Sequence, residues 1–147
     1  MRSKRILLVE DNPDDLELML ISLRESNLFK NVDVVRDGVE ALEYLFAEGQ
    51  YAGRDIENLP ELILLDLKLP RLSGMDVLKR VRADPRTRLI PIVMLTSSKE
   101  DVDVASCYEN GANGYVQKPV DFDQFIETVK SLGTYWLVLN ESPIVRG

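Results

Sequence analysis

The chain has 147 residues, of which 45% are hydrophobic and 29% charged, so it can form one globular domain with a sizeable core. A net charge of −7 argues against non-specific nucleic-acid binding, and the absence of histidine excludes His-based catalytic triads and His metal sites within the chain. The lone Cys107 cannot form an internal disulfide, and the sequence has neither a membrane-spanning run nor a signal-peptide pattern. We therefore expect a cytoplasmic protein that binds neither nucleic acid nor membrane.

The first half of the chain alternates apolar runs with helical patterns. The run 5–10 predicts a strand, and Asn12 followed by Pro13 is typical of a helix start. A second strand is predicted over 32–36, followed by a helix after Asp37. The apolar residues that recur at helical spacing are Leu16, Met19, Leu20 and Leu23 in the first helix, and Ala41, Leu42, Leu45 and Phe46 in the second.

A long polar loop over 49–60 separates these elements from the second half of the chain. The run 61–70 is almost continuously apolar, which is typical of a strand buried on both faces of a parallel sheet. The remaining predicted elements are a helix over 74–83, a strand over 91–96, a helix over 99–110, a strand over 114–119 and a last helix from Asp121.

Strands alternate with helices five times, and no internal repeat or linker interrupts the pattern. This alternation predicts a single α/β domain over 1–147, with a doubly wound, five-stranded parallel sheet that carries helices on both faces. In the flavodoxin-like arrangement, the strand order is 2-1-3-4-5. No output domain follows the last predicted helix, so output would be a change of binding surface.

Each central strand ends in polar residues, which are Glu10 and Asp11, Asp66, Thr96 and Lys118. Ligands of open parallel sheets bind beyond the carboxyl ends of the strands, so these side chains should converge there. Clustered carboxylates repel one another unless a cation lies among them, and hard oxygen ligands favour Mg²⁺. An ionised Asp beside Mg²⁺ and a lysine can form an aspartyl phosphate without a general base.

These motifs resemble the receiver domains of two-component response regulators, over essentially the whole chain. The matching segments are Ile6-Leu7-Leu8-Val9-Glu10-Asp11-Asn12-Pro13, Leu65-Asp66, Leu69-Pro70, Gly74-Met75-Asp76, Leu95-Thr96-Ser97, Gly111-Ala112 and Lys118-Pro119-Val120. The resemblance implies a signalling protein that takes a phosphoryl group from a sensor histidine kinase. It would be no enzyme, apart from self-phosphorylation by small donors and slow self-dephosphorylation.

The resemblance also implies a role for each acid at the strand ends. Asp66 would be the phosphoryl acceptor, in a reaction that depends on Mg²⁺, with Mn²⁺ as the alternative ion. Asp11 and Asp66 would bind the metal directly, Glu10 through a water molecule, and Lys68 through its backbone carbonyl. The neighbouring pair Asp14–Asp15 is open to a simpler interpretation, namely that helix N-termini favour negative charge.

Further roles fall on residues of the last two strands. By the same resemblance, Thr96 and Lys118 would contact the phosphoryl group, Tyr115 would be the aromatic switch residue, and the Lys118–Pro119 peptide would be cis. Lys68 and Ser98 occupy the positions that tune phosphoryl lifetime in this family, and a lysine at the first of them is unusual.

One subgroup fits better still, the small stand-alone regulators paired with bacterial phytochromes. That likeness rests on the Asn12-Pro13-Asp14-Asp15 segment, the 49–60 loop and an aromatic tail. It implies a phytochrome as the partner kinase. Two readings within the family stay open, a relay that passes phosphate to a histidine of another protein and a scaffold that does not depend on phosphorylation.

Two other classes of protein are alternatives to the receiver interpretation. Phosphatases of the haloacid dehalogenase type need a second acid two residues after the nucleophile, where this chain has Lys68. Flavodoxin-like electron carriers need a hydroxyl- and glycine-rich phosphate loop after the first strand, where this chain has acids. Both patterns argue against these classes.

The end of the chain predicts a contact with another molecule. Apolar residues of the last helix recur every three or four positions and predict one buried face, formed by Phe122, Phe125, Ile126, Val129 and Leu132. The run 134–139 is apolar on every side, so part of it should be exposed unless it folds back over the first helix. We expect a symmetric homodimer with Tyr135 and Trp136 at the interface.

Overall fold

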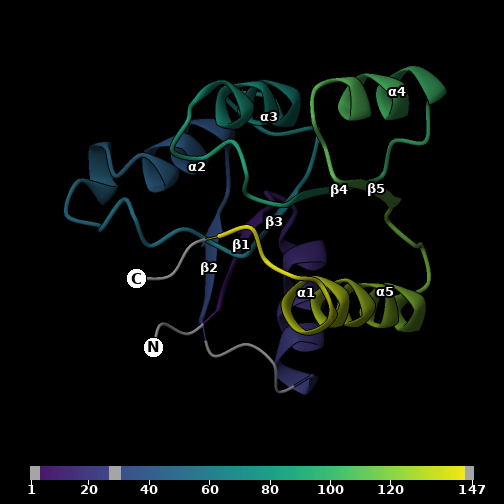
Figure 1. Cartoon of the computed structure of the whole chain (residues 1–147). Helices are drawn as coiled ribbons and strands as arrows, with labels where there is room; N and C mark the ends of the chain where they lie inside the picture. Colours follow the sequence, from purple (N-terminus) through teal and green to yellow (C-terminus); the bar gives the residue numbers. More distant parts are fainter. Residues whose placement is uncertain (1–3, 27–30, 145–147) are drawn as a thin grey trace.

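The computed structural model describes residues 4–26 and 31–144 and consists of one parallel sheet between two layers of helices (Figure 1). The sheet has the order β2-β1-β3-β4-β5, and each neighbouring pair is parallel, which confirms the predicted doubly wound fold. Its strands are β1 (Arg5–Val9), β2 (Asn31–Val35), β3 (Leu62–Leu65), β4 (Ile92–Thr96) and β5 (Gly114–Gln117).

Side chains of the central strands point alternately to the two faces and form two separate cores. In β1, Leu7 and Val9 join one core, whereas Ile6 and Leu8 join the other. All four are buried, as are all residues of β3 and β4, which explains why these strands are continuously apolar in the sequence.

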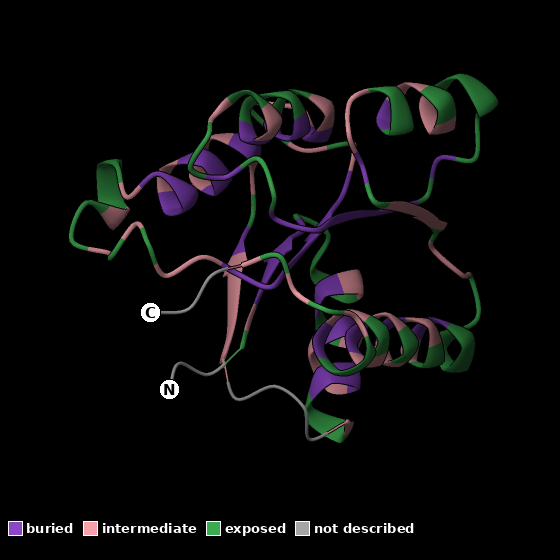
Figure 2. Ribbon diagram, viewed as in Figure 1, coloured by how far each residue is buried: buried purple, intermediate pink, exposed green. Residues whose placement is uncertain are grey.

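Helices α2, α3 and α4 cover one face of the sheet, and α1 and α5 cover the other (Figure 1). Figure 2 shows the buried residues gathered along the sheet and on the helix sides that face it. The helices are α1 (Pro13–Glu25), α2 (Gly38–Leu45), α3 (Gly74–Ala83), α4 (Asp101–Glu109) and α5 (Phe122–Thr134). None of the helices in the described parts of the chain is long and apolar enough to cross a membrane.

Four of these helices begin at a side chain that accepts a backbone hydrogen bond. Asn12 Oδ1 accepts from the backbone nitrogens of Asp14 and Asp15, at 3.0 and 3.1 Å, and Pro13 is the first residue of α1. The corresponding residues of α2, α3 and α5 are Asp37, Ser73 and Asp121. The Asn12 cap fixes where α1 begins relative to the acids Glu10 and Asp11 that precede it.

The long loop over 49–60 is anchored to α2. It contains a 3₁₀ turn, η1 (Gly49–Tyr51), and the Arg54 guanidinium lies 4.2 Å from the centre of the Tyr44 ring. Arg54 Nε also donates to the backbone carbonyl of Tyr44 at 2.7 Å. The loop is therefore tied to the fold by a cation–π contact and a hydrogen bond.

The end of the chain differs in part from the predicted helix face. The buried residues of α5 and of the π-helical turn η2 (Tyr135–Leu139) follow at intervals of four, and they are Phe125, Val129, Gly133 and Leu137. Phe122 is the first residue of α5, one turn before the first buried position, and it is 70% exposed, so its predicted burial was wrong.

Candidate functional site

Three carboxylates meet at the carboxyl edge of the sheet. Glu10 follows β1 and is 1% exposed, and Asp66 follows β3 and is also buried. Asp11 is exposed. Oxygens of Glu10, Asp11 and Asp66 all lie within 4.8 Å of one another, so the structure brings together the three acids that the sequence predicted to converge. Register explains this, because Val9 pairs with Leu65 and the next residue of each strand is an acid.

Lys118 lies among these acids, with its side chain only 8% exposed. Its Nζ is 2.7 Å from Glu10 Oε1, 2.8 Å from Asp15 Oδ2 and 3.0 Å from Asp66 Oδ2. The backbone nitrogen of Lys118 donates to the Thr96 carbonyl at 2.8 Å, which fixes the residue beyond the end of β5. A buried ammonium group with three carboxylate partners is well paired.

The two buried carboxylates are held on both of their oxygens. Glu10 Oε2 accepts from the backbone nitrogen of Asn12 at 3.1 Å, whereas Oε1 faces Lys118. Asp66 Oδ1 accepts from the backbone nitrogen of Lys68 at 3.3 Å, whereas Oδ2 faces Lys118. The orientation of each carboxylate is thus set by one backbone group and one lysine.

The site carries more negative than positive charge. Burial raises the pKa of Glu10 to about 7, since the charge of Asp66 adds to this effect and hydrogen bonds from Lys118 and Asn12 only partly offset it. Burial by itself would lower the pKa of Lys118, but hydrogen bonds to Asp15 and Glu10 and the charge of Asp66 raise it above its usual range. Such an imbalance favours a bound cation.

A hard divalent cation fits this donor set. The three clustered acids offer only oxygen atoms, and the exposed side chain of Asp11 leaves room for water beside the buried pair. Mg²⁺ and Mn²⁺ both prefer carboxylate and water oxygens. Glu10, Asp11 and Asp66 are therefore the side chains that could hold such an ion.

Gly74 is a residue of the site that sequence reasoning did not single out for a role. A Cβ atom at this position would lie 2.0 Å from the backbone carbonyl oxygen of Asp66. The backbone nitrogen of Gly74 donates to the Leu67 carbonyl at 2.8 Å, which closes the loop after β3. Glycine is needed because the backbones approach too closely for any side chain.

Asp15 also reaches the site. The sequence allowed the interpretation that Asp14 and Asp15 only favour the start of a helix, and both lie in the first turn of α1. The structure adds the 2.8 Å contact between Asp15 and Lys118, two residues that are 103 positions apart. No local sequence signal distinguishes Asp15 from Asp14.

Thr96 and Ser98 lie at the end of β4. Thr96 is fully buried, and its Oγ1 accepts from the backbone nitrogen of Ser98 at 3.5 Å. The Ser98 hydroxyl donates to Asp103 Oδ2 in the first turn of α4 at 2.5 Å. Ser98 therefore joins the end of β4 to α4.

Tyr115 contacts the same segment from β5. Its hydroxyl donates to the backbone carbonyl of Ser98 at 2.9 Å, and burial raises the pKa of this phenol. Tyr115 pairs with Met94 in the sheet and packs partly against the core under α2, α3 and α4. The predicted switch residue thus lies one hydrogen bond from the residue that tethers α4.

The structure corrects one predicted feature near Lys118 and places Lys68 at the surface. None of the peptide bonds between described residues is cis, so the expected cis bond between Lys118 and Pro119 was wrong. The trans form is the lower-energy state of such a bond by about 0.5–1 kcal/mol. The side chain of Lys68 is exposed, two residues beyond Asp66.

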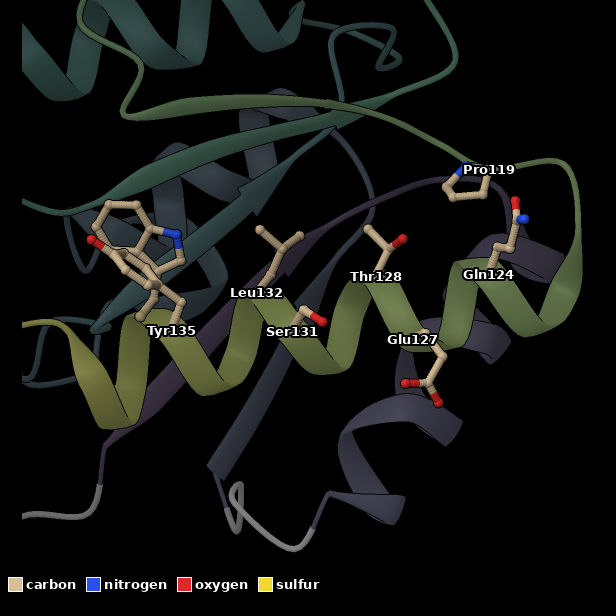
Figure 3. Close-up of a pocket in the computed structure, with 8 residues that line it drawn as sticks. Pro119, Gln124, Glu127, Thr128, Ser131, Leu132 and Tyr135 are labelled. Carbon is tan, nitrogen blue, oxygen red and sulfur yellow. The ribbon is translucent and has the colours of Figure 1, made fainter.

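Tyr135 and Trp136 lie apart from the acids, at the end of α5. Tyr135 is 49% exposed, whereas Trp136 packs partly against the core under α1 and α5. The apolar run 134–139 therefore folds back in part over its own domain. The two rings stack edge to face at 5.1 Å. Both line an open groove of about 510 Å³ along α5, whose other walls include Pro119, Thr128 and Leu132 (Figure 3).

Comparison with known protein families gives one match over most of the chain. The model of the response regulator receiver domain matches residues 6–130. Among curated proteins, the probable methanogenesis regulatory protein FilR2 of Methanothrix harundinacea is 40% identical over 139 residues, or 94% of this chain and 86% of its own. The response regulator Rcp1 of Synechocystis sp. is 35% identical over 134 residues, or 91% of this chain and 89% of its own.

Solved structures of response regulators have the same fold as this chain. The phosphorylated cyanobacterial phytochrome response regulator RcpA has a TM-score of 0.90 at 38% identity, over 97% of this chain and 99% of its own. The Mn²⁺-bound form of Rcp1 gives 0.88 at 34%, over 95% and 99%. The bacteriophytochrome response regulator RtBRR gives 0.77 at 53%, over 97% and 85%.

Proposed function

Because this chain belongs to the response regulator receiver domain family, whose members accept a phosphoryl group on an aspartate, we propose that Asp66 is the acceptor in this protein. The observation that carries the proposal is the contact of the Lys118 ammonium group with Asp66 Oδ2 at 3.0 Å, beside the acids Glu10 and Asp11. We further propose that the chain acts as a single receiver domain in the cytoplasm, with a changed binding surface as its output.

The residues of the site suit this reaction. An oxygen of the ionised Asp66 carboxylate forms the new bond to phosphorus, while the bond from phosphorus to the donor breaks and its electron pair leaves with the donor atom. Lys118 keeps its proton and can turn an N–H toward the transferring oxygens, and Thr96 can donate its hydroxyl to them. No general base is required.

Receiver domains bind a divalent metal, and we propose that Mg²⁺ is the ion here, with Mn²⁺ as its substitute. The bound ion would neutralise charge on the transferring phosphoryl group. Asp11 and Asp66 would hold it directly, Glu10 through water and Lys68 through its backbone carbonyl. The clustered oxygens of the three acids support this assignment, as does the solved Mn²⁺-bound form of Rcp1.

Intact-mass analysis after incubation with acetyl phosphate and Mg²⁺ tests the acceptor. Wild type should gain the mass of one phosphoryl group, and Asp66→Asn should gain none while its circular dichroism spectrum stays native. Asp14→Asn is the control, because Asp14 is exposed and its carboxylate forms no hydrogen bond or ion pair with the residues that the structure describes. Phosphorylation of Asp66→Asn at the wild-type rate would refute the assignment.

We propose that the partner is a sensor histidine kinase, and specifically a phytochrome. Support comes from RcpA and RtBRR, which are described as phytochrome and bacteriophytochrome response regulators. Transfer from a purified phytochrome kinase that is faster than transfer from an unrelated histidine kinase would support the pairing; equal rates would contradict it.

We propose that Lys68 prolongs the lifetime of the aspartyl phosphate by shielding it from attacking water. A charged lysine has no acceptor and cannot act as a base toward attacking water. Its side chain is exposed two residues from Asp66, so it can be replaced without disturbing the core. Lys68→Ala should therefore lose its phosphate faster than wild type, and slower loss would reverse this role.

Homodimerisation through the end of α5 is also part of the proposal. The support is a set of exposed apolar side chains in one turn, namely Tyr135, Val138 and Leu139. Sedimentation of Tyr135→Ala should show weaker self-association than wild type, and Tyr108→Ala on α4, which is 51% exposed, is the matched control. A wild type that stays monomeric with and without a phosphoryl mimic would end the dimer hypothesis.

A further inference from the structure

Three carboxylates surround Lys118. One of them comes from a different kind of element than the other two. Glu10 and Asp66 come from strand ends and belong to the cluster of acids that can hold a metal. Asp15 comes from the first turn of α1 and is not part of that cluster, yet it lies as close to Lys118 as the others, at 2.8 Å.

The position of Asp15 is fixed by the start of α1. Its backbone nitrogen donates to Asn12 Oδ1 at 3.1 Å, and Pro13 restricts the backbone at the first position of the helix. A side chain on such a rigid element is a precise partner for a long, flexible lysine. Lys118, in turn, is 8% exposed and has little freedom to find another partner.

The three N–H bonds of an ammonium group match the three carboxylates around Lys118. Two of these acceptors would take part in the proposed reaction, because Asp66 would accept the phosphoryl group and Glu10 belongs to the acids that could hold a metal ion. Of the three, Asp15 is the acceptor that would stay available to Lys118 throughout.

We propose that Asp15 is a positioning residue, which holds the Lys118 ammonium group against Asp66 so that it can donate to the incoming phosphoryl oxygens. The role rests on the proposed function of Asp66. It goes beyond the acids at the strand ends, since Asp15 acts only through Lys118.

The alternative is that Asp15 merely places negative charge at a helix N-terminus. Asp14 separates the two interpretations, because it lies in the same first turn, carries the same charge and donates its backbone nitrogen to the same Asn12 Oδ1. Of these two acids, Asp15 is the one whose carboxylate contacts Lys118 in the structure. Asp14→Ala is therefore the matched control for Asp15→Ala.

The first experiment needs no phosphate and no metal. Nitrogen-15 NMR of the lysine amino groups, assigned with Lys118→Arg, should show a Lys118 signal that exchanges slowly with water. In Asp15→Ala this exchange should be faster by about tenfold, as expected for loss of a charged hydrogen bond. Asp14→Ala should match wild type. Equal exchange in Asp15→Ala and wild type would overturn the proposal.

The second experiment measures phosphorylation by acetyl phosphate in a double-mutant cycle with Lys118→Ala. Asp15→Ala should slow phosphorylation by about tenfold, and Asp15→Asn, whose amide oxygen can still accept from Lys118, should slow it less. In the Lys118→Ala background, Asp15→Ala should change nothing further, because the two residues act as a unit.

Each outcome of the double-mutant cycle either supports or overturns the positioning role of Asp15. An Asp15→Ala variant that reacts as fast as wild type, or one whose effect persists without Lys118, would overturn the positioning role. If wild type itself takes up no phosphoryl group on Asp66, the proposed function fails, and the NMR experiment still decides whether Asp15 anchors Lys118.

Discussion

Helices α3 and α4 lie on the same face of the sheet, but they are attached to it very differently. In α3, Gly74, Val77, Leu78 and Val81 are buried. Cys107 is the one buried residue of α4, and Figure 2 shows this helix as largely exposed or intermediate. Because apolar burial supplies most of the free energy that holds a helix to its sheet, α4 should be the more weakly held of the two.

The start of each helix shows the same difference. Ser73 caps α3 with its own side chain, whereas no side chain caps the first turn of α4 at Glu100. What ties the first turn of α4 to the sheet is the 2.5 Å hydrogen bond from Ser98 to Asp103. Since Ser98 follows the buried Thr96 by two residues, one short segment joins the proposed phosphoryl site to the first turn of α4.

The largest expected effect is on the free energy of unfolding. Leu78→Ala removes a fully buried side chain from α3 and should lower this free energy by about 2–5 kcal/mol. Cys107→Ala, at the most buried position of α4, should lower it by about 1 kcal/mol. Urea denaturation monitored by circular dichroism measures both, and equal losses would contradict the comparison.

Amide hydrogen exchange of the unmodified protein should separate the two helices directly. We expect amides in the middle of α4 to exchange at least about tenfold faster than those of α3, because local opening of α4 exposes less apolar surface. Exchange measured by NMR or mass spectrometry tests this. Protection of α4 equal to that of α3 would mean that other contacts hold it.

Removal of the tether should loosen α4 alone. Asp103→Ala loses the hydrogen bond from Ser98, which should speed exchange in the first turns of α4 by an amount equivalent to about 1 kcal/mol. Asp101→Ala, an exposed acid in the same first turn, is the control and should leave exchange near the wild-type rate. Similar effects of both changes would attribute the result to helix charge.

The smallest effect is expected at Tyr115. Tyr115→Phe loses the 2.9 Å hydrogen bond to the Ser98 carbonyl but keeps the ring against the core. Because Tyr115 is only partly buried, the free energy of unfolding should fall by about 0.5 kcal/mol, the low end for a lost hydrogen bond. Exchange in the segment that contains Ser98 should rise slightly. A stability equal to that of wild type would show that water replaces the phenol without loss.

Much of the site was predictable because it lies at the ends of strands. Once the alternation of strands and helices indicated a parallel sheet, residues that follow buried strands had to meet at one edge, and Glu10, Asp66, Thr96 and Lys118 do lie at that edge. The contact between Asp15 and Lys118 was not predictable, because it depends on how α1 and the end of β5 are placed against each other.

The sequence by itself determined the order of elements, the burial of the central strands and the edge where the acids gather. These features follow from local patterns: continuous apolar runs, caps and the period of each helix. Tertiary structure alone decided that Phe122 is exposed, that Trp136 packs on its own domain and that a hydrogen bond from Ser98 holds the first turn of α4. Such features are set by how each helix is rotated and seated on the sheet, which apolar spacing constrains only loosely.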